Sequence, residues 1–358
     1  MTFDRNPVPP QSRTCASLDA GARATPSRRR VLRHGLALAL CASLAPAMLP
    51  AAAAEAAGNG AIAGGKPIRI LVGAPPGGTT DTLARTLGQE MGKILGQSVV
   101  VENRPGAGGN IAADMVAKSA PDGSTLLMSF TSHTINATLY RKLPFDPIAD
   151  FTPITLVASV PSVLVANPSL PASNVADLIK LAKSRPGKLN FGIGALGSSL
   201  HMAGDMFKMM TGTYIVNIPY KGTTPAVTDL LAGQVDLMFA STLNVLPHIK
   251  AGRLKALGVT SPQPLPQLPG VPPIGATVKG FESNAWFGLF GPAGLPPEIT
   301  RTLYQAASKV LESPGVAKRL ETDGAEPVGS PPDQFAAFVR EDVKRWAKVV
   351  RYSGATVE

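Results

Sequence analysis

Cysteine, aromatic residues and charged residues are all scarce in this chain. Only Cys15 and Cys41 occur among its 358 residues, which excludes a zinc ribbon, an iron–sulfur cluster and a disulfide scaffold. Aromatic residues make up 5% and do not cluster with basic residues, so we expect no nucleic-acid binding. Charged residues make up 16%, which excludes coiled-coil and charged-disordered classes, and the 44% of hydrophobic residues are sufficient for a large core. A chain of this length is expected to form two lobes of ordinary domain size.

The first 57 residues have the layout of a secretory signal of the twin-arginine type. Residues 27–33 read Ser-Arg-Arg-Arg-Val-Leu-Arg, a mildly apolar run follows over residues 35–49, and alanines precede the cleavage site expected at residues 53–57. A membrane-spanning helix is the weaker interpretation, because Pro46 and Pro50 interrupt the apolar run and no basic flank follows it.

Removal of this segment changes the composition from which function is inferred. It takes away seven arginines and three acidic residues, which lowers the formal net charge from +10 to +6, and it takes away both cysteines. The mature protein therefore has no thiol chemistry, and its remaining positive charge favours anionic small molecules. We expect an exported, soluble protein located in the periplasm.

Short β-rich runs alternate with amphipathic segments from Lys66 onward, which predicts an α/β fold of mainly parallel sheets flanked by helices. Strands are predicted at residues 68–74, 98–102, 125–130, 154–166, 189–193, 214–219, 235–240, 254–260 and 284–290. Helices are predicted at residues 81–95, 106–118, 175–183, 199–210, 224–232, 297–311 and 332–350. Residues 261–273 contain six prolines and are expected to form a surface connection.

Two of the predicted strands are suited to cross between lobes. The run over residues 154–166 is unusually long and is interrupted at Pro161, and residues 284–290 would carry the chain back. The first lobe would then comprise residues 58–164 together with 285–358, and the second lobe residues 165–284.

Two glycine-rich loops each follow a predicted strand and precede a predicted helix. Residues 76–81 read Pro-Gly-Gly-Thr-Thr-Asp, and residues 192–197 read Gly-Ile-Gly-Ala-Leu-Gly before Ser198 and Ser199. Backbone N–H groups at a helix N-terminus bind carboxylates and phosphates, and ligands of open α/β sheets bind at the carboxyl ends of strands. Thr131 and Ser132, at the end of another strand, would add hydroxyl donors. The alternative for residues 79–81 is that they serve only as a helix cap.

The second loop also matches G-x-G-x-x-G, the fingerprint of dinucleotide-binding folds. That fingerprint requires an acidic residue at the end of the next strand, and residues 216–221 contain none. An exported NAD(P)-dependent oxidoreductase that uses residues 192–197 is therefore kept only as the alternative function.

Residues for catalysis do not form a recognisable set. None of the three mature histidines has metal-ligand spacing, and a G-x-S-x-G nucleophile motif is absent. Asp81, Asp205 and Asp236 show no paired spacing suited to general acid–base catalysis. We expect no enzymatic activity, no metal and no cofactor.

Longer motifs resemble the tripartite tricarboxylate transporter substrate-binding proteins, also called the Bug family. The stretch Glu102-Asn-Arg-Pro-Gly-Ala-Gly-Gly-Asn110 is highly specific, and the likeness covers essentially the whole mature chain. The other motifs, in order, are Lys66-Pro-Ile-Arg-Ile70, Pro75-Pro-Gly-Gly-Thr-Thr-Asp81, Pro121-Asp-Gly123, Pro186-Gly-Lys-Leu-Asn190, Pro219-Tyr-Lys-Gly222, Gly233-Gln-Val-Asp236, Ala251-Gly-Arg-Leu-Lys-Ala-Leu257 and Trp286-Phe-Gly288.

The resemblance implies a two-lobed, type II-like periplasmic binding protein whose lobes close on a small organic carboxylate. It implies a tripartite membrane permease or a sensor ectodomain as partner, and a monomeric receptor. Together with the loops, it leads us to expect ligand contacts from Gly77, Gly78, Thr79, Thr80, Asp81, Thr131, Ser132, Gly194, Ala195, Gly197, Ser198, Ser199, His201, Tyr220 and Ser241.

Three departures from the family pattern concern the ligand more than the fold. Thr79 and Ala195 stand where the family usually has glycine, and Ile193 replaces a serine-bearing strand end. Residues 271–277 lack the usual Thr and Glu.

Overall fold

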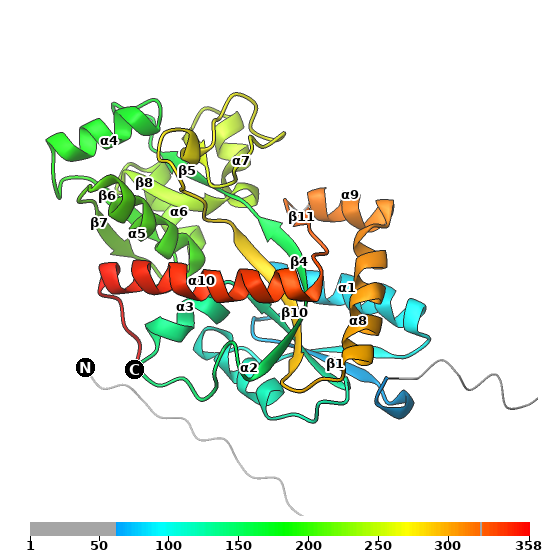
Figure 1. The fold of residues 1–358 in the computed structure, drawn as a ribbon. Helices are drawn as coiled ribbons and strands as arrows, with labels where there is room; N and C mark the ends of the chain where they lie inside the picture. The colour runs from blue at the N-terminus through cyan, green and yellow to red at the C-terminus, as the bar shows by residue number, and fades with distance from the viewer. Residues whose placement is uncertain (1–61, 323) are drawn as a thin grey trace, which may run out of the picture. The chain divides into compact units, whose positions relative to one another are not determined.

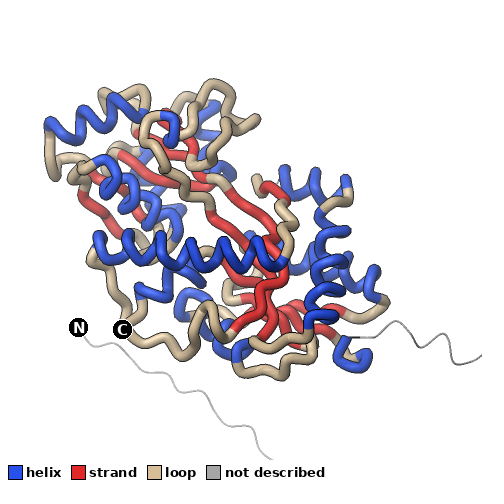
Figure 2. The backbone as a smooth tube through the Cα atoms, viewed as in Figure 1, coloured by secondary structure: helices blue, strands red, loops and turns tan. Residues whose placement is uncertain are grey.

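Two β-sheets with flanking helices make up residues 62–358 except residue 323, the part of the chain that this computed structural model describes (Figures 1 and 2). The signal predicted over residues 1–57 lies outside the described residues. Within the described part, no helix combines the length and the apolar character needed to cross a membrane.

The first sheet has six strands in the order β11-β4-β10-β3-β1-β2. Its elements are β1 (Ile68–Val72), α1 (Thr79–Leu95), β2 (Val99–Asn103), α2 (Asn110–Ala117), β3 (Thr125–Phe130), α3 (Ser132–Leu139), β4 (Phe151–Val160), β10 (Ala285–Pro292), α8 (Pro297–Leu311), α9 (Pro314–Thr322), β11 (Glu326–Pro327) and α10 (Pro332–Ser353). Strand β1 is buried on both faces, with Ile70 and Val72 in one apolar cluster and Leu71 in another. Burial on both faces explains its mostly apolar sequence, in which Arg69 is the one charged residue and pairs with Glu102 of β2 (2.7 Å).

The second sheet has five strands in the order β7-β6-β8-β5-β9. Its elements are β5 (Ser162–Ala166), α4 (Val175–Ser184), β6 (Asn190–Ile193), α5 (Ser199–Thr211), β7 (Val216–Pro219), α6 (Thr223–Leu231), β8 (Leu237–Ser241), α7 (Thr242–Lys250) and β9 (Lys255–Val259). Along β5, Leu164 and Ala166 face one apolar cluster while Val163 and Val165 face another.

The chain crosses between the sheets at the two predicted places. The long β-run divides at Pro161 into β4 and β5, and the chain returns to the first sheet through β10. Ser162 N donates to Thr260 Oγ1 (2.8 Å), and Thr260 Oγ1 donates to Asn284 Oδ1 (2.9 Å), so one threonine links the two crossings.

Both sheets are mixed, and the prediction of mainly parallel sheets is wrong. Strands β1, β2 and β3 are parallel, whereas β10 runs antiparallel to both β3 and β4. In the second sheet β5 runs antiparallel to β8 and β9, while β6 is parallel to β7 and β8. The antiparallel pairs all involve β5, β10 or β11. Strands β5 and β10 arrive from the other sheet and so enter without the helical crossover that makes neighbours parallel.

Helix α10 packs against elements of both sheets (Figure 1). Phe335, near its start, shares an apolar cluster with Phe290 of β10, and Trp346, near its end, shares one with Phe207 of α5. Between them lies the buried Asp342, whose Oδ2 accepts hydrogen bonds from Thr134 Oγ1 (2.6 Å) and Trp286 Nε1 (2.8 Å).

Candidate functional site

The N-terminus of α1 is open. Its first backbone hydrogen bond runs from Thr82 N to Gly78 O (2.9 Å), and Gly78, at the N-cap position, has no side chain to cap the helix. The preceding N–H groups, on Thr79, Thr80 and Asp81, have no carbonyl one turn earlier in the helix to bond. They are directed out of the positive end of a 17-residue helix and can bind an anion.

Asp81 does not cap this helix end; it anchors the loop before it. Its buried carboxylate accepts hydrogen bonds from Gly77 N (2.9 Å) and Asn103 Nδ2 (2.9 Å), and it pairs with Arg85 (2.9 Å). Burial alone would raise the pKa of Asp81, but Arg85, the Gly77 N–H and Asn103 together lower it. Because the Arg85 cation balances the carboxylate, Asp81 does not cancel the attraction of the helix end for an anion.

A cavity of about 350 Å³ lies against this loop. It is lined by Gly77, Thr79, Thr82 and Leu83 from the loop and α1, by Leu243 from α7, and by Arg319, Leu320 and Ala325 from the α9–β11 region. Elements of both sheets therefore line it. Arg319 is the only charged residue among those described as lining it, so the cavity favours an anion.

The second predicted loop is capped by its own side chains. Ser198 Oγ accepts from His201 N (3.2 Å) and donates to Ala195 O (2.9 Å), so its hydroxyl is engaged within the loop. The N–H of Gly197 donates to His201 Nδ1 (3.0 Å), which leaves the proton on Nε2, 3.1 Å from Asp205 Oδ2.

Asp205 is the centre of a buried polar network behind this loop. Besides His201, it binds Lys208 Nζ (2.6 Å) and Asn217 Nδ2 (2.9 Å). Burial raises the pKa of Asp205, but these donors outweigh burial and lower it to about 2. His201 and its partners therefore position the loop, and a ligand contact of His201 stays a prediction.

Gly192 and Gly194 serve packing, which removes the support for a dinucleotide. A side chain at Gly194 would meet the backbone of Gly222 and Thr223 at about 3 Å, and one at Gly192 would meet Val235 at 3.2 Å. In a dinucleotide site the second glycine leaves room for the pyrophosphate. Here protein backbone occupies that side of the loop.

The other predicted site residues are distributed over several places. The Thr131 hydroxyl accepts from Trp286 N (2.9 Å), and Tyr220 donates its hydroxyl to Asp229 (2.8 Å), so both are engaged internally. Ser132 begins α3, Ser199 begins α5, Ser241 ends β8 beside the cavity-lining α7, and Ala195 lies in the second loop. Thr80 is buried in the first turn of α1, whereas Gly78 and Thr79 are exposed.

The structure brings some of these segments together and leaves others apart. Gly197 packs against Leu139 of α3, and Gly324 packs against Thr242 at the start of α7. The cavity is lined by residues of the first predicted loop and by none of the second. Leu243, Arg319, Leu320 and Ala325 were not predicted; Leu243 follows a strand end, but Arg319 carries no motif by which its position could be recognised. The residues described contain no group of three potential metal ligands.

A two-lobed solute-binding protein is the class that this fold and the open helix end define, and comparison with known proteins places the chain within it. The sequence model of the protein family described as the tripartite tricarboxylate transporter family receptor matches residues 83–355. The chain is 40% identical to the protein BugT of Bordetella pertussis over 296 residues, which cover 82% of this chain and 91% of BugT. It therefore belongs to the tripartite tricarboxylate transporter receptor family, a family of periplasmic solute-binding proteins.

Solved structures agree with this assignment. Rpa4515 of R. palustris, solved with adipate, is 38% identical with a TM-score of 0.69, and the match covers 82% of this chain and 99% of that chain. MatC of Rhodopseudomonas palustris, solved with bound malate, is 34% identical with a TM-score of 0.66, and the match covers 80% and 99% of the two chains. The predictions of the family and of the two-lobed α/β architecture are confirmed.

Proposed function

We propose that this protein, after export to the periplasm, captures a small organic carboxylate between its two lobes and delivers it to a membrane permease or a sensor. The observation that carries the proposal is the open N-terminus of α1, whose free N–H groups adjoin a cavity in which Arg319 is the one charged residue among the described lining residues. Relatives solved with adipate and malate support the carboxylate class. We take the lobes to be residues 58–164 with 285–358 and residues 165–284, and the receptor to be monomeric.

A carboxylate would use the N–H groups of Thr79 and Thr80, with hydroxyl groups nearby. Hydrogen bonds in which the acceptor is charged contribute about 1.5–3 kcal/mol each. Arg319, at the α9 side of the cavity, would attract a second carboxylate if the ligand carries one. Because Asp81 holds the loop in place before the ligand arrives, little conformational entropy is lost on binding.

The test uses a substitution that removes one backbone donor and little else. Thr79 is the first helical residue, where proline is well tolerated, and Gly78 before it is extended (φ −82°, ψ 171°), as a residue preceding proline requires. Thr79→Pro should raise Kd roughly tenfold to a hundredfold while the melting temperature of the free protein changes little. Thr79→Ala, which keeps the N–H, is the matched control.

Affinity is measured by calorimetry on the mature protein, freed of retained ligand by unfolding and refolding. The panel contains adipate, malate, succinate, benzoate and the neutral diamide of adipate. We expect at least one carboxylate to bind and the diamide not to bind. Binding of no carboxylate by the refolded protein would refute the proposed function, and equal affinities of the proline and alanine variants would refute the role of the helix end.

A further inference from the structure

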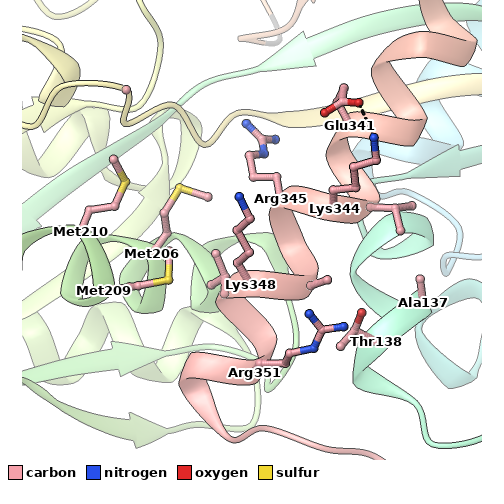
Figure 3. Close-up of a pocket in the computed structure, with 14 residues that line it drawn as sticks. Ala137, Thr138, Met206, Met209, Met210, Glu341, Lys344, Arg345, Lys348 and Arg351 are labelled. Atoms are coloured by element: carbon pink, nitrogen blue, oxygen red, sulfur yellow. Dashed lines mark hydrogen bonds and ion pairs between the residues drawn. The ribbon is translucent and has the colours of Figure 1, made fainter.

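A second groove, of about 660 Å³, shares no lining residue with the cavity at α1 (Figure 3). One wall is α5, the other is α10, and Ala137 and Thr138 of α3 also line it. Gly280 also lines it, close to the return crossing, where Arg345 donates to Glu282 O (3.2 Å). We call it the α5–α10 groove. The proposed carboxylate function gives it no role.

The α5 wall consists of methionine. Met206, Met209 and Met210 have the spacing that places side chains on one face of a helix, and Figure 3 shows all three at the groove. Met206 is 3% exposed, but Met210 is 37% exposed, so apolar surface reaches the solvent. Methionine side chains are flexible and polarizable, and they adapt to apolar side chains of different shapes.

The α10 wall is basic. Lys344, Arg345, Lys348 and Arg351 line the groove, and Figure 3 shows Arg345 and Lys348 extending from α10 toward the methionines. Lys344 pairs with Glu341 (2.8 Å) and Arg345 with Asp342. Lys348 and Arg351 form no ion pair with any residue that the structure describes, so the groove has an excess of positive charge.

We propose that the α5–α10 groove is a docking site for an acidic protein segment that also carries apolar side chains. From Lys344 to Arg351 the cations extend over about 10 Å of helix, since each residue adds about 1.5 Å. That length matches two turns of an opposing helix with a carboxylate on each turn, whereas a single small carboxylate would engage only one end. Apolar side chains of the segment would pack on the methionines while its carboxylates pair with Lys348 and Arg351.

The first test determines which peptide sequences bind the groove. A phage library of random 16-residue peptides is selected on the mature protein, and the enriched peptides are measured by fluorescence anisotropy. We expect the peptides to combine Asp or Glu with Leu, Met or Phe, and to bind less tightly as salt is added. The double variant Lys348→Glu/Arg351→Glu should bind them at least tenfold more weakly.

The matched control is Lys180→Glu/Lys183→Glu on α4. These two lysines have the same spacing of three, both are exposed, and Lys183, like Arg351, lies in the last turn of its helix. This variant changes the net charge equally and should bind the peptides as the unmodified protein does. Circular dichroism and thermal unfolding verify that both variants are folded.

Methyl NMR of methionine locates the peptide on the surface. The signals of Met206, Met209 and Met210 should shift on binding, while those of Met91 in α1 and Met128 in β3, both buried in the apolar cluster of the first sheet, should not. Enrichment of no peptide, or of peptides without acidic residues, overturns the proposal. Equal affinity of the peptides for the two double variants also overturns the proposal. The same holds if decanoate or anionic vesicles shift the three groove methyl signals and no peptide does.

Discussion

Asp81→Ala tests whether the loop before α1 holds the ligand because it is rigid. The substitution removes the acceptor of the Gly77 N–H and one of the two acceptors of the Asn103 amide, and a hydrogen bond to a charged acceptor contributes about 1.5–3 kcal/mol. Arg85 is 52% exposed, so its freed guanidinium returns to water and adds little. We therefore expect a loss of about 3 kcal/mol in the free energy of unfolding, measured in urea.

The same substitution should weaken ligand binding without touching the ligand. Once the loop is free to move, the free-energy cost of ordering it adds to the free energy of binding. A cost of about 1.4 kcal/mol raises Kd tenfold. Calorimetry with whichever panel carboxylate binds best measures this change. Asp177→Ala is the control, because Asp177 is likewise the third residue of its helix and accepts the N–H four residues before it, from Ser173 (3.2 Å).

Measuring stability and affinity together distinguishes a loop that Asp81 does not anchor from a loop that does not hold the ligand. The control should lose at most about 1 kcal/mol and leave Kd unchanged. If Asp81→Ala loses stability but keeps its affinity, the loop does not hold the ligand. If it loses no stability, the hydrogen bonds of Asp81 do not anchor the loop.

Three further substitutions test particular contacts. The pKa of Asp205 is lowered to about 2 from 3.8, so its stabilising contribution is complete above pH 3.8 and is lost as the pH falls toward 2. Asp205→Asn should therefore remove about 2 kcal/mol of the pH dependence of the unfolding free energy, measured by urea unfolding at several pH values. Burial among phenylalanines lowers the pKa of His133 from 6.5 to about 4, so the native state loses up to about 3 kcal/mol as the pH falls between these values, and His133→Phe should flatten that slope. Gly197→Ala forces a side chain at φ +75° against Leu139 and should cost about 1–3 kcal/mol, partly restored by Leu139→Ala; full stability of the single variant by thermal unfolding would show that the two segments do not pack tightly.

Several elements could be predicted because their signals are local. Residues 68–72 are apolar except for Arg69, the helix after them has apolar residues at helical spacing, and Pro161 marks the point where one long β-run becomes β4 and β5. Helices α3, α7 and α9 were not predicted. Helix α3 contains β-branched and polar residues with poor helix propensity, and contacts such as that of Thr134 with Asp342, 208 residues away, stabilise it.

In the candidate site, too, the local features could be predicted and the long-range contacts could not. Its glycines and threonines follow a strand and open a helix, and that order in the sequence was sufficient to predict an anion-binding loop. The sequence could not show that the Asp81 carboxylate is already engaged by protein groups, because its partner Asn103 comes from the next strand. Nor could it show that the Ser198 hydroxyl is used within its own loop or that Arg319 lines the cavity.

The sequence by itself determined the family, the α/β alternation, the two crossings and the glycine loop that opens α1, since each depends on residues that are neighbours in the chain. Only the tertiary structure decided that the sheets are mixed, which side chains of the loops are already engaged, and that α5 and α10 enclose a methionine-lined basic groove. The physical reason is that strand pairing, burial and side-chain hydrogen bonds join residues tens to hundreds of positions apart. No local pattern records which distant segment will supply the partner.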